Sequence, residues 1–496
     1  ALWDVKREQL FIARDRVGIK PLYYSRKGDQ FVFSSEVRPL ANCGLVDVTI
    51  DNTSLYEYFL TGSIPGPNTL WNEIKCLEPG YYAIVRDSRM ITKQYWDIPI
   101  TDGGFRNTQD VTEATNALLN TIVKDHLIAD VPVGTFLSAG VDSSLITAIA
   151  ADIHPGIHSF TAAFPGEPED EGQVAAASAK KLGTTHHAYE ISNNFFDEIE
   201  DQFRNIDQPF AISSALSLGR ISALARKHVK VVLSGDGGDE LFGGYHRHRT
   251  PGLPSFLRYI PASMHNSILQ IGAKITGRKS LEQLRLNLQI SEAGRFFERV
   301  IVSSPTDALS FLHPDIAKNV DTERYAKRIQ SFFSRTEGAD VLSRILYADM
   351  KTTLPDEMLT KCDRMTMING VEGRVPFLDH RMVEMAFSIP SGFKQDDQHG
   401  KLPLRNLLAK RMGKDLAFRN KTGFNSPLQQ WLKNDNSTYE HARQVITNSA
   451  ELGFINNAVL KELLANMRHA KSTNVFDMVC LATFFNNNPF SSQSHS

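Results

Sequence analysis

The sequence lacks any apolar run long enough to cross a bilayer, which takes about 20 residues, and no secretory signal is visible at its start. Cysteine is scarce: the 4 cysteines are Cys43, Cys76, Cys362 and Cys480, with no Cys-x-x-Cys pair and no metal-clamp spacing among them. We therefore expect reduced structural thiols in a cytoplasmic protein. Neither sign of charge is in excess, since the net charge at pH 7 is −2, so charge gives no reason to expect nucleic acid or a membrane as a partner.

The length and composition are those of an ordinary globular protein. The chain has 496 residues, of which 42% are hydrophobic and 22% charged. This is too long for one hydrophobic core, so two or three domains are expected.

Residues 1–98 are rich in the aromatic and β-branched residues of strands. The expected strands are Leu10–Ala13, Pro21–Tyr24, Gln30–Ser35, Gly80–Val85 and Gln94–Trp96. The chain begins with Ala1 in what resembles the middle of a strand, which predicts that the true N-terminus precedes it. A polar stretch over residues 99–110 is typical of a linker, so we predict a domain boundary there and a second domain over residues 111–490.

From Val111 the pattern changes to strands that alternate with helices. Apolar strands are predicted at 133–137, 157–164, 187–191 and 229–233, and helices at 114–127, 171–182 and 216–227, with another after Ser144. This alternation predicts an α/β domain with a parallel sheet covered on both faces. Beyond Gly244 the pattern is mostly helical.

The strongest local signal is a loop of small and hydroxyl residues, Ser138–Ser144, between a buried strand and a helix. Small residues let the backbone wrap closely around an anion, and free amides at the helix start would point at it. The loop lacks the Lys of a Walker-type phosphate loop. Asp142 would repel a bare phosphate, so it makes sense as a ligand of Mg²⁺. The alternative is a tight structural turn.

A second apolar strand ends in the Gly-rich turn Ser234–Tyr245, which carries Asp236, Asp239 and Glu240. Ligands of open parallel sheets bind at the carboxyl ends of the strands, so both loops should meet at one edge. Asp142 and Asp239 could then hold one Mg²⁺ that bridges nucleotide phosphates, which leaves Asp236 for acid–base chemistry. The alternative is a solvated acidic turn.

These segments resemble a known family. Ser138–Ser144 resembles the pyrophosphate loop of ATP pyrophosphatases, with Ala139 where Gly is usual, and Ser234–Glu240 resembles the second loop of asparagine synthetases. Three further blocks are similar to that family, in the same order and spacing: 354–379, 400–405 and 421–424. The resemblance implies an adenine nucleotide alpha hydrolase-like synthetase domain with a helical C-terminal part.

The N-terminal region is similar to the late part of class II glutaminase domains, through residues 11–24 and 33–36. The resemblance implies the remnant of an αββα N-terminal-nucleophile domain. In that family an N-terminal Cys attacks the glutamine amide. No such Cys is present here, since Cys43 and Cys76 are internal, so we expect this chain to use ammonia and its full-length parent to use glutamine.

The resemblance implies a carbon–nitrogen ligase that activates the aspartate β-carboxylate as a β-aspartyl-adenylate, with pyrophosphate as the leaving group. Ammonia then displaces AMP. It assigns Lys421 to the phosphates and Asp236 to the incoming ammonia, and it places Glu372 and Arg374 beside the aspartyl site, where a structural ion pair is an equal alternative. ATP would be bound by Leu137, Ser138, Ala139, Gly140, Val141, Asp142, Ser143, Ser144, Ala162, Ser234 and Gly235, and Mg²⁺ by Asp142 and Asp239.

Two alternatives stay open. The first is a related amidotransferase that acts on a carboxylate of a polysaccharide, peptide or antibiotic precursor, because similar folds serve different substrates. The second is a non-catalytic binding protein. A homodimer is compatible with the resemblance. His186 and His187 have no carboxylate at metal-ligand spacing, which favours a structural role for them.

Overall fold

We analysed a computed structural model of the chain. It describes residues 1–87, 89–166, 170–191, 202–203, 206–249, 264, 267–271, 290–419 and 428–487.

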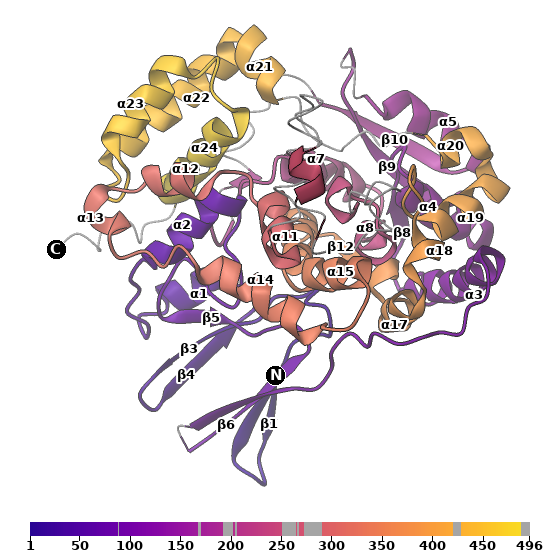
Figure 1. The fold of residues 1–496 in the computed structure, drawn as a ribbon, viewed down its shortest axis with the longest axis horizontal. Helices are drawn as coiled ribbons and strands as arrows, with labels where there is room; N and C mark the ends of the chain where they lie inside the picture. The colour runs from indigo at the N-terminus through magenta and orange to yellow at the C-terminus, as the bar shows by residue number, and fades with distance from the viewer. Residues whose placement is uncertain are drawn as a thin grey trace.

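The N-terminal part contains two antiparallel sheets, which lie at the bottom of the molecule in Figure 1. One sheet has the order β1 (Leu2–Asp4), β2 (Gln9–Ala13), β6 (Tyr81–Arg86), β7 (Arg89–Gln94), and the other the order β4 (Gln30–Ser34), β3 (Tyr23–Lys27), β5 (Ile74–Cys76). The expected strand at Gln94–Trp96 is wrong in its bounds, because β7 pairs with β6 along Arg89–Gln94 and ends there.

Helix α2 (Asn52–Thr61) was not predicted, and it ties this part to the C-terminal helices. It is buried on all sides, so it has no amphipathic pattern to read. Its cap Asp51 and its Glu57 both pair with Arg324, at 2.7 and 2.6 Å, and the Tyr58 hydroxyl donates to the Asp477 carbonyl oxygen. The N-terminal sheets are therefore anchored to the rest of the chain through a buried helix.

The second part is built on a five-stranded sheet, which confirms the predicted α/β fold. The strand order is β10 (Thr185–Glu190), β9 (His158–Ala163), β8 (Val133–Phe136), β11 (Val231–Leu233), β12 (Glu372–Arg374), and every pair is parallel. The connecting helices are α3 (Thr108–His126), α4 (Val141–Ile153), α5 (Gly172–Leu182) and α7 (Ser214–Ala225). Strand β12 was not predicted, because its three residues carry two charges and no apolar pattern.

The chain winds away from β8 in both directions. It runs through α4 and α5 to β9 and β10, then returns through α7 to β11 on the other side of β8. Strand–helix–strand connections between parallel strands are right-handed, so connections that move in opposite directions along the sheet put their helices on opposite faces. The loops after β8 and β11 therefore lie side by side at the carboxyl edge, where such sheets bind ligands.

The remainder is helical, as predicted, and extends from the upper left of Figure 1 across its centre to its right-hand side. Its larger helices are α11 (Glu292–Val300), α14 (Arg324–Arg335), α15 (Val341–Lys351), α16 (Thr360–Ile368), α17 (His380–Ser388), α19 (Leu402–Met412), α22 (Asn436–Asn448), α23 (Asn457–Asn466) and α24 (Ser472–Asn487). Shorter ones include α8 (Gly238–Phe242), α12 (Pro305–Ser310), α13 (Pro314–Ala317), η5 (Pro376–Leu378), α18 (Ser391–Lys394), α20 (Lys414–Ala417) and α21 (Leu428–Asn434). The short helix α1 (Val37–Asn42) belongs to the N-terminal part.

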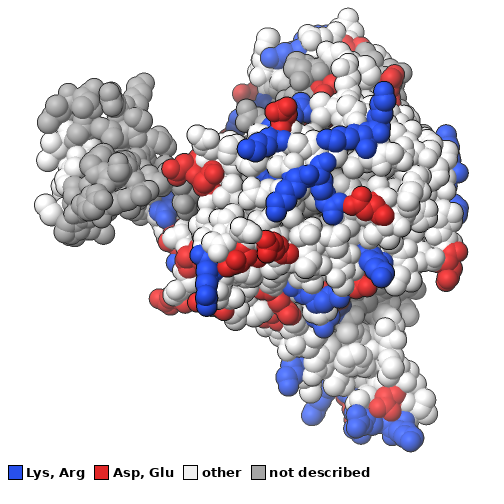
Figure 2. Space-filling model, turned by 90° about the vertical axis from the view of Figure 1, so that its right-hand side faces the viewer, with Lys and Arg blue, Asp and Glu red and all other residues white. Residues whose placement is uncertain are grey.

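Surface charge and thiol state agree with the composition. Basic and acidic side chains are interspersed over the face in Figure 2, so that face offers no extended basic surface. All four cysteines are free thiols. Within the described residues, none of the helices has the length and apolar character needed to cross a membrane.

Candidate functional site

The first loop, Leu137–Gly140, is a compact turn between β8 and α4. Leu137 is buried, and its amide donates to the Phe160 carbonyl oxygen at 2.9 Å. The Ser138 and Ser143 hydroxyls lie 2.8 Å apart, and Ser144 Oγ donates to the Ser138 carbonyl oxygen at 3.1 Å. These bonds give the loop a fixed shape around the start of α4, which has Gly140 as its cap and no side-chain cap hydrogen bond.

Three loop amides that precede α4 already donate to side chains. The amides of Ser138 and Gly140 donate to serine hydroxyls of the same loop, at 3.1 and 3.0 Å. The Ala139 amide donates to Glu171 Oε2 at 3.1 Å, and Glu171 is buried. A carboxylate oxygen therefore sits against this amide, where a phosphate oxygen would be received.

The second loop packs directly against the first, and glycines make the close approach possible. A Cβ atom on Gly235 would lie 2.7 Å from the Ser143 amide nitrogen, and one on Gly238 would lie 2.5 Å from Asp142 Oδ1. Real Cβ atoms do not come this close to other heavy atoms. The Gly-rich sequence after β11 is thus required to bring Asp142 beside the second loop.

Asp142 and Asp239 meet at one cationic group, the ammonium of Lys401. Lys401 Nζ pairs with Asp142 Oδ2 and lies 2.7 Å from Asp239 Oδ1. The Lys401 residue is 5% exposed, and these two carboxylates hold its pKa above the ordinary value despite burial. The sequence placed the two aspartates together, as the geometry does, but gave no role to Lys401.

The backbone of Lys401 is also unusual. Its φ is 60°, in the left-handed region that favours glycine, and its amide donates to the Phe242 carbonyl oxygen at 2.9 Å. A side chain in this region costs of order 1–3 kcal/mol and is often retained for function. The glycine before it has no room for a side chain either, because a Cβ on Gly400 would lie 2.0 Å from the Gly243 carbonyl oxygen.

The donor set fits a divalent cation. Two carboxylates, each 14% exposed, converge on a single positive charge. Carboxylate oxygens are the ligands that Mg²⁺ prefers, and it usually takes one or two of them together with substrate phosphates. Asp142 and Asp239 are therefore arranged to hold either the Lys401 ammonium or such an ion.

Asp236 lies on the second loop beside this pair. Its Oδ2 accepts a hydrogen bond from Ser234 Oγ at 2.6 Å, and its Oδ1 is 3.9 Å from Lys361 Nζ. Ser234 itself is held by its amide, which donates to the Arg374 carbonyl oxygen at 2.8 Å. Asp236 thus has a fixed orientation and a nearby cation.

Other predicted residues are placed as follows. Ala162 is buried in β9, with its backbone in the sheet. Glu372 pairs with Val231 at the start of β11, away from the carboxyl edge, and its Oε1 accepts from Arg374 Nε at 2.8 Å. This hydrogen bond lowers the pKa of Glu372. The structure thus contains the ion pair that was the alternative to a place beside the aspartyl site. Lys421 lies outside the described residues.

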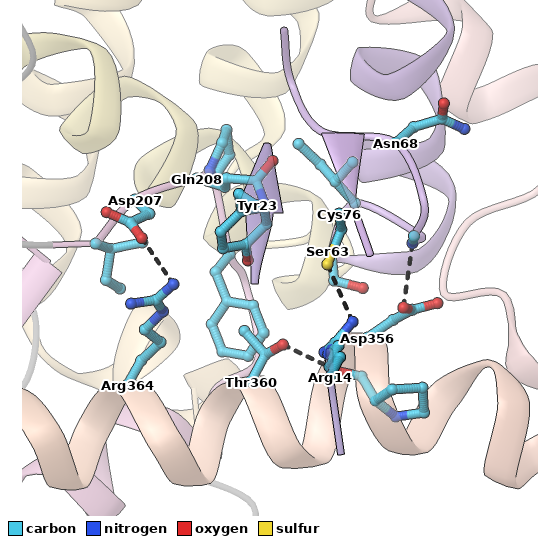
Figure 3. A pocket seen from close by; sticks show the side chains of 16 residues that line it. Arg14, Tyr23, Ser63, Asn68, Cys76, Asp207, Gln208, Asp356, Thr360 and Arg364 are labelled. Carbon is cyan, nitrogen blue, oxygen red and sulfur yellow. Dashed lines mark hydrogen bonds and ion pairs between the residues drawn. The ribbon is translucent and has the colours of Figure 1, made fainter. Parts of the chain in front are cut away.

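A pocket separates the N-terminal sheets from the helix that carries Lys361. Figure 3 shows Arg14, Tyr23 and Cys76 on one side, facing Thr360 and Arg364 of α16. Arg14 Nη1 donates to Cys76 Sγ at 3.0 Å, and Arg364 pairs with Asp207 at 2.7 Å. Helix α16 therefore contacts the pocket through one face and the Asp236 loop through another.

The turn that begins α16 lies next to a buried charge network. It is a single π-helical segment, η4 (Leu354–Leu359), a type often found at functional sites. Burial raises the pKa of Glu357 there to about 8. Nearby, the buried Asp349 accepts from Arg247 at 3.0 Å and pairs with His248 at 2.6 Å. Sequence reasoning did not find this network, because its members lie about 100 residues apart.

Comparison with known proteins agrees with the two-part architecture. A family model described as asparagine synthase matches residues 114–484, and one described as a glutamine amidotransferase domain matches residues 1–96. Asparagine synthetase (glutamine-hydrolyzing) 1 of Bacillus subtilis (strain 168) is 32% identical over 482 residues, which cover 95% of this chain and 74% of that protein.

Further relatives point to the same family and to its variety. A putative asparagine synthetase (glutamine-hydrolyzing) of Mycobacterium tuberculosis (strain ATCC 25618 / H37Rv) is 32% identical over 87% of this chain and 67% of that protein. Amidase chry2 of Gibberella zeae is 26% identical over 79% of this chain and 63% of that protein. The resemblance seen in the sequence is confirmed, and the chain belongs to the asparagine synthetase family.

Proposed function

We propose that the chain catalyses the ATP-dependent amidation of aspartate to asparagine through a β-aspartyl-AMP intermediate. Family membership supports the coarser statement, an amidotransferase ligase that uses ATP. The observation that carries the proposal is the meeting of Asp142, Asp239 and Lys401 where the loops after β8 and β11 touch. With a bound Mg²⁺ this group would carry a net positive charge and could neutralise a polyphosphate at the edge of a parallel sheet.

The loop residues have defined tasks in this scheme. Serine hydroxyls and amides of residues 138–144 bind phosphate oxygens, after the triphosphate displaces Glu171 from the Ala139 amide. Leu137, Ala162, Ser234 and Gly235 line the adenosine side. Asp142 and Asp239 would hold Mg²⁺, which when bound neutralises charge on the departing pyrophosphate. Lys401, released from the two carboxylates, can then turn its ammonium toward the phosphates.

The second half-reaction needs a nitrogen nucleophile. Asp236 accepts a proton from the incoming ammonium or orients ammonia against the adenylate. Lys361 Nζ lies 3.9 Å from Asp236 Oδ1 and adds a positive charge beside it. We assign Lys421 to the phosphates on the family resemblance alone. We propose ammonia as the nitrogen nucleophile of this half-reaction.

We also propose that residues 1–98 form the glutaminase-type part, 99–110 the linker and 111–490 the synthetase part. The same proposal includes a cytoplasmic location and a homodimer. A second acceptor class is favoured by one observation, the similarity to a relative described as an amidase rather than an asparagine synthetase. That acceptor would be another carboxylate, of a polysaccharide, peptide or antibiotic precursor.

The test is pyrophosphate release by the full chain with ATP and Mg²⁺, with aspartate present or omitted, and with either ammonium or glutamine. Asparagine formed with ammonium supports the proposal. ATP binding without aspartate-dependent pyrophosphate release would exclude aspartate and favour another acceptor. Failure to bind ATP with Mg²⁺ would support the non-catalytic alternative.

A further inference from the structure

Three histidines from three separate elements meet near the amino ends of the parallel strands. His158 begins β9, His187 lies in β10, and His228 lies in the turn between α7 and β11. One ring nitrogen of each lies within 4.8 Å of the others. His158 Nδ1 and His187 Nε2 are 2.9 Å apart, and the rings of His187 and His228 stack with centroids 4.0 Å apart.

The cluster is held in place by the sheet. His187 pairs with Phe160 in the ladder, and its ring stacks on that of Phe160 at 5.2 Å. Phe160 in turn lies over Gly134 of β8, where a Cβ atom would come within 2.8 Å of the Phe160 ring. His228 is anchored by its amide, which donates to the Ala225 carbonyl oxygen at 2.9 Å. Two of the three rings are therefore on a rigid support, and the third, that of the exposed His228, can adjust.

Lone pairs are available for a ligand. A hydrogen bond between two imidazole nitrogens needs one of them to be an unprotonated acceptor, so at least one of His158 and His187 is neutral in this arrangement. The neighbouring His186 is not part of the cluster, and its Nδ1 lies 3.0 Å from Ser159 Oγ.

We propose that His158, His187 and His228 bind one divalent transition-metal ion of the Zn²⁺ class, with a fourth position open to water. Zn–N bonds of about 2.0–2.1 Å put the nitrogens of a tetrahedral site about 3.3 Å apart, so His228 closes the site by moving roughly 1–2 Å toward the other two. Three imidazoles without a carboxylate select Zn²⁺, Ni²⁺ or Cu²⁺ over Mg²⁺. The ion joins β9, β10 and the α7–β11 turn, and it lies away from the edge where Asp142 and Asp239 meet.

The test titrates the untagged full chain, stripped with chelator, with ZnCl₂ in a calorimeter. We expect one equivalent of Zn²⁺ to bind tightly, and His187→Asn and His228→Asn should each raise its Kd by at least about tenfold. Loss of a residue that only supports a metal ligand costs about 10–100-fold in metal affinity, so loss of a ligand should cost at least as much. His469→Gln, at an exposed histidine elsewhere, is the matched control and should bind as the parent does. Because His228 is exposed, its variant should fold normally, which the melting temperature without metal verifies.

Cobalt gives an independent readout. Co²⁺ in a site of three imidazoles and water should give visible d–d absorption bands that disappear in His228→Asn. The proposal is overturned if Zn²⁺ binds the His187→Asn and His228→Asn variants as tightly as the parent. It is also overturned if the tight equivalent is lost in Asp142→Asn, which would move the ion to the carboxylate site.

Discussion

The ammonium of Lys401 holds the place between Asp142 and Asp239 that we assign to Mg²⁺, so replacing it should make the protein depend on the metal. Lys401→Met keeps the length of the side chain and removes its charge. Taking one partner from a buried ion pair costs about 3–5 kcal/mol, and here two carboxylates lose the same partner. In chelator the apparent melting temperature should therefore fall by several degrees.

Added Mg²⁺ should reverse most of that loss. An ion present at 100 times its Kd stabilises the folded state by about 2.7 kcal/mol, which offsets much of the predicted cost. In the parent protein Mg²⁺ has to displace the ammonium first, so the same addition should raise the melting temperature less. The assay is thermal unfolding of both proteins in chelator and in a Mg²⁺ series.

Lys351→Met is the matched control. Lys351 is similarly buried and lies 2.6 Å from Asp97, far along the chain from either loop. That variant should lose stability without recovering it in Mg²⁺. The reasoning is refuted if Lys401→Met melts like the parent in chelator, or if Mg²⁺ restores both variants equally.

Three further predictions follow from the same contacts. Asp239→Asn should lower aspartate-dependent pyrophosphate release by about 100-fold or more, and a loss below tenfold would contradict its role at the phosphates. Glu171→Gln should lower the Kd for ATP by about 3–10-fold, or roughly 0.6–1.4 kcal/mol, because it removes a negative charge from the Ala139 amide. The control Glu190→Gln, at an exposed position, should leave the Kd for ATP unchanged. Equal effects of the two variants would refute the displacement of Glu171 by the triphosphate. Burial raises the pKa of Glu357 from 4.5 to about 8, so this group binds a proton when folded that it releases when unfolded, and stability should fall as pH rises from about 5 to 8. In Glu357→Gln the melting temperature should fall less steeply as pH rises. A slope identical to that of the parent would contradict the attribution of this pH dependence to Glu357.

Much of the fold was readable because local pattern and tertiary role agree. Strands β8 and β11 are apolar runs that end in small residues and lead into helices, so their positions and the meeting of Asp142 with Asp239 followed from the order of elements. Several elements were not predicted, among them β5, α1, β12 and α2, and for the last two the reason lies in what they contact. Strand β12 exists because its backbone pairs with β11, and α2 is buried on every side.

The parts of the site that the sequence could not predict are contacts between side chains and partners far apart in the chain. Lys401 is separated from Asp142 by 259 positions, and Glu171 from Ala139 by 32, and nothing local marks either as a partner. The histidine cluster is the same case, since His187 gains its neighbours only when β9 and the α7–β11 turn lie beside β10. For Glu372 the sequence left two roles open, a structural ion pair with Arg374 or a place beside the aspartyl site. The structure contains the ion pair.

The central claim is that ATP is cleaved at its α-phosphorus by the carboxylate of aspartate at the two-loop site. The most direct measurement supplies aspartate labelled with ¹⁸O in its β-carboxylate, together with ATP, Mg²⁺ and ammonium, and follows the label by mass spectrometry. Attack on the α-phosphorus predicts AMP that carries one ¹⁸O, unlabelled pyrophosphate, and loss of the labelled AMP in Asp239→Asn. ADP with labelled inorganic phosphate would contradict the account, because the carboxylate would then have attacked the γ-phosphorus.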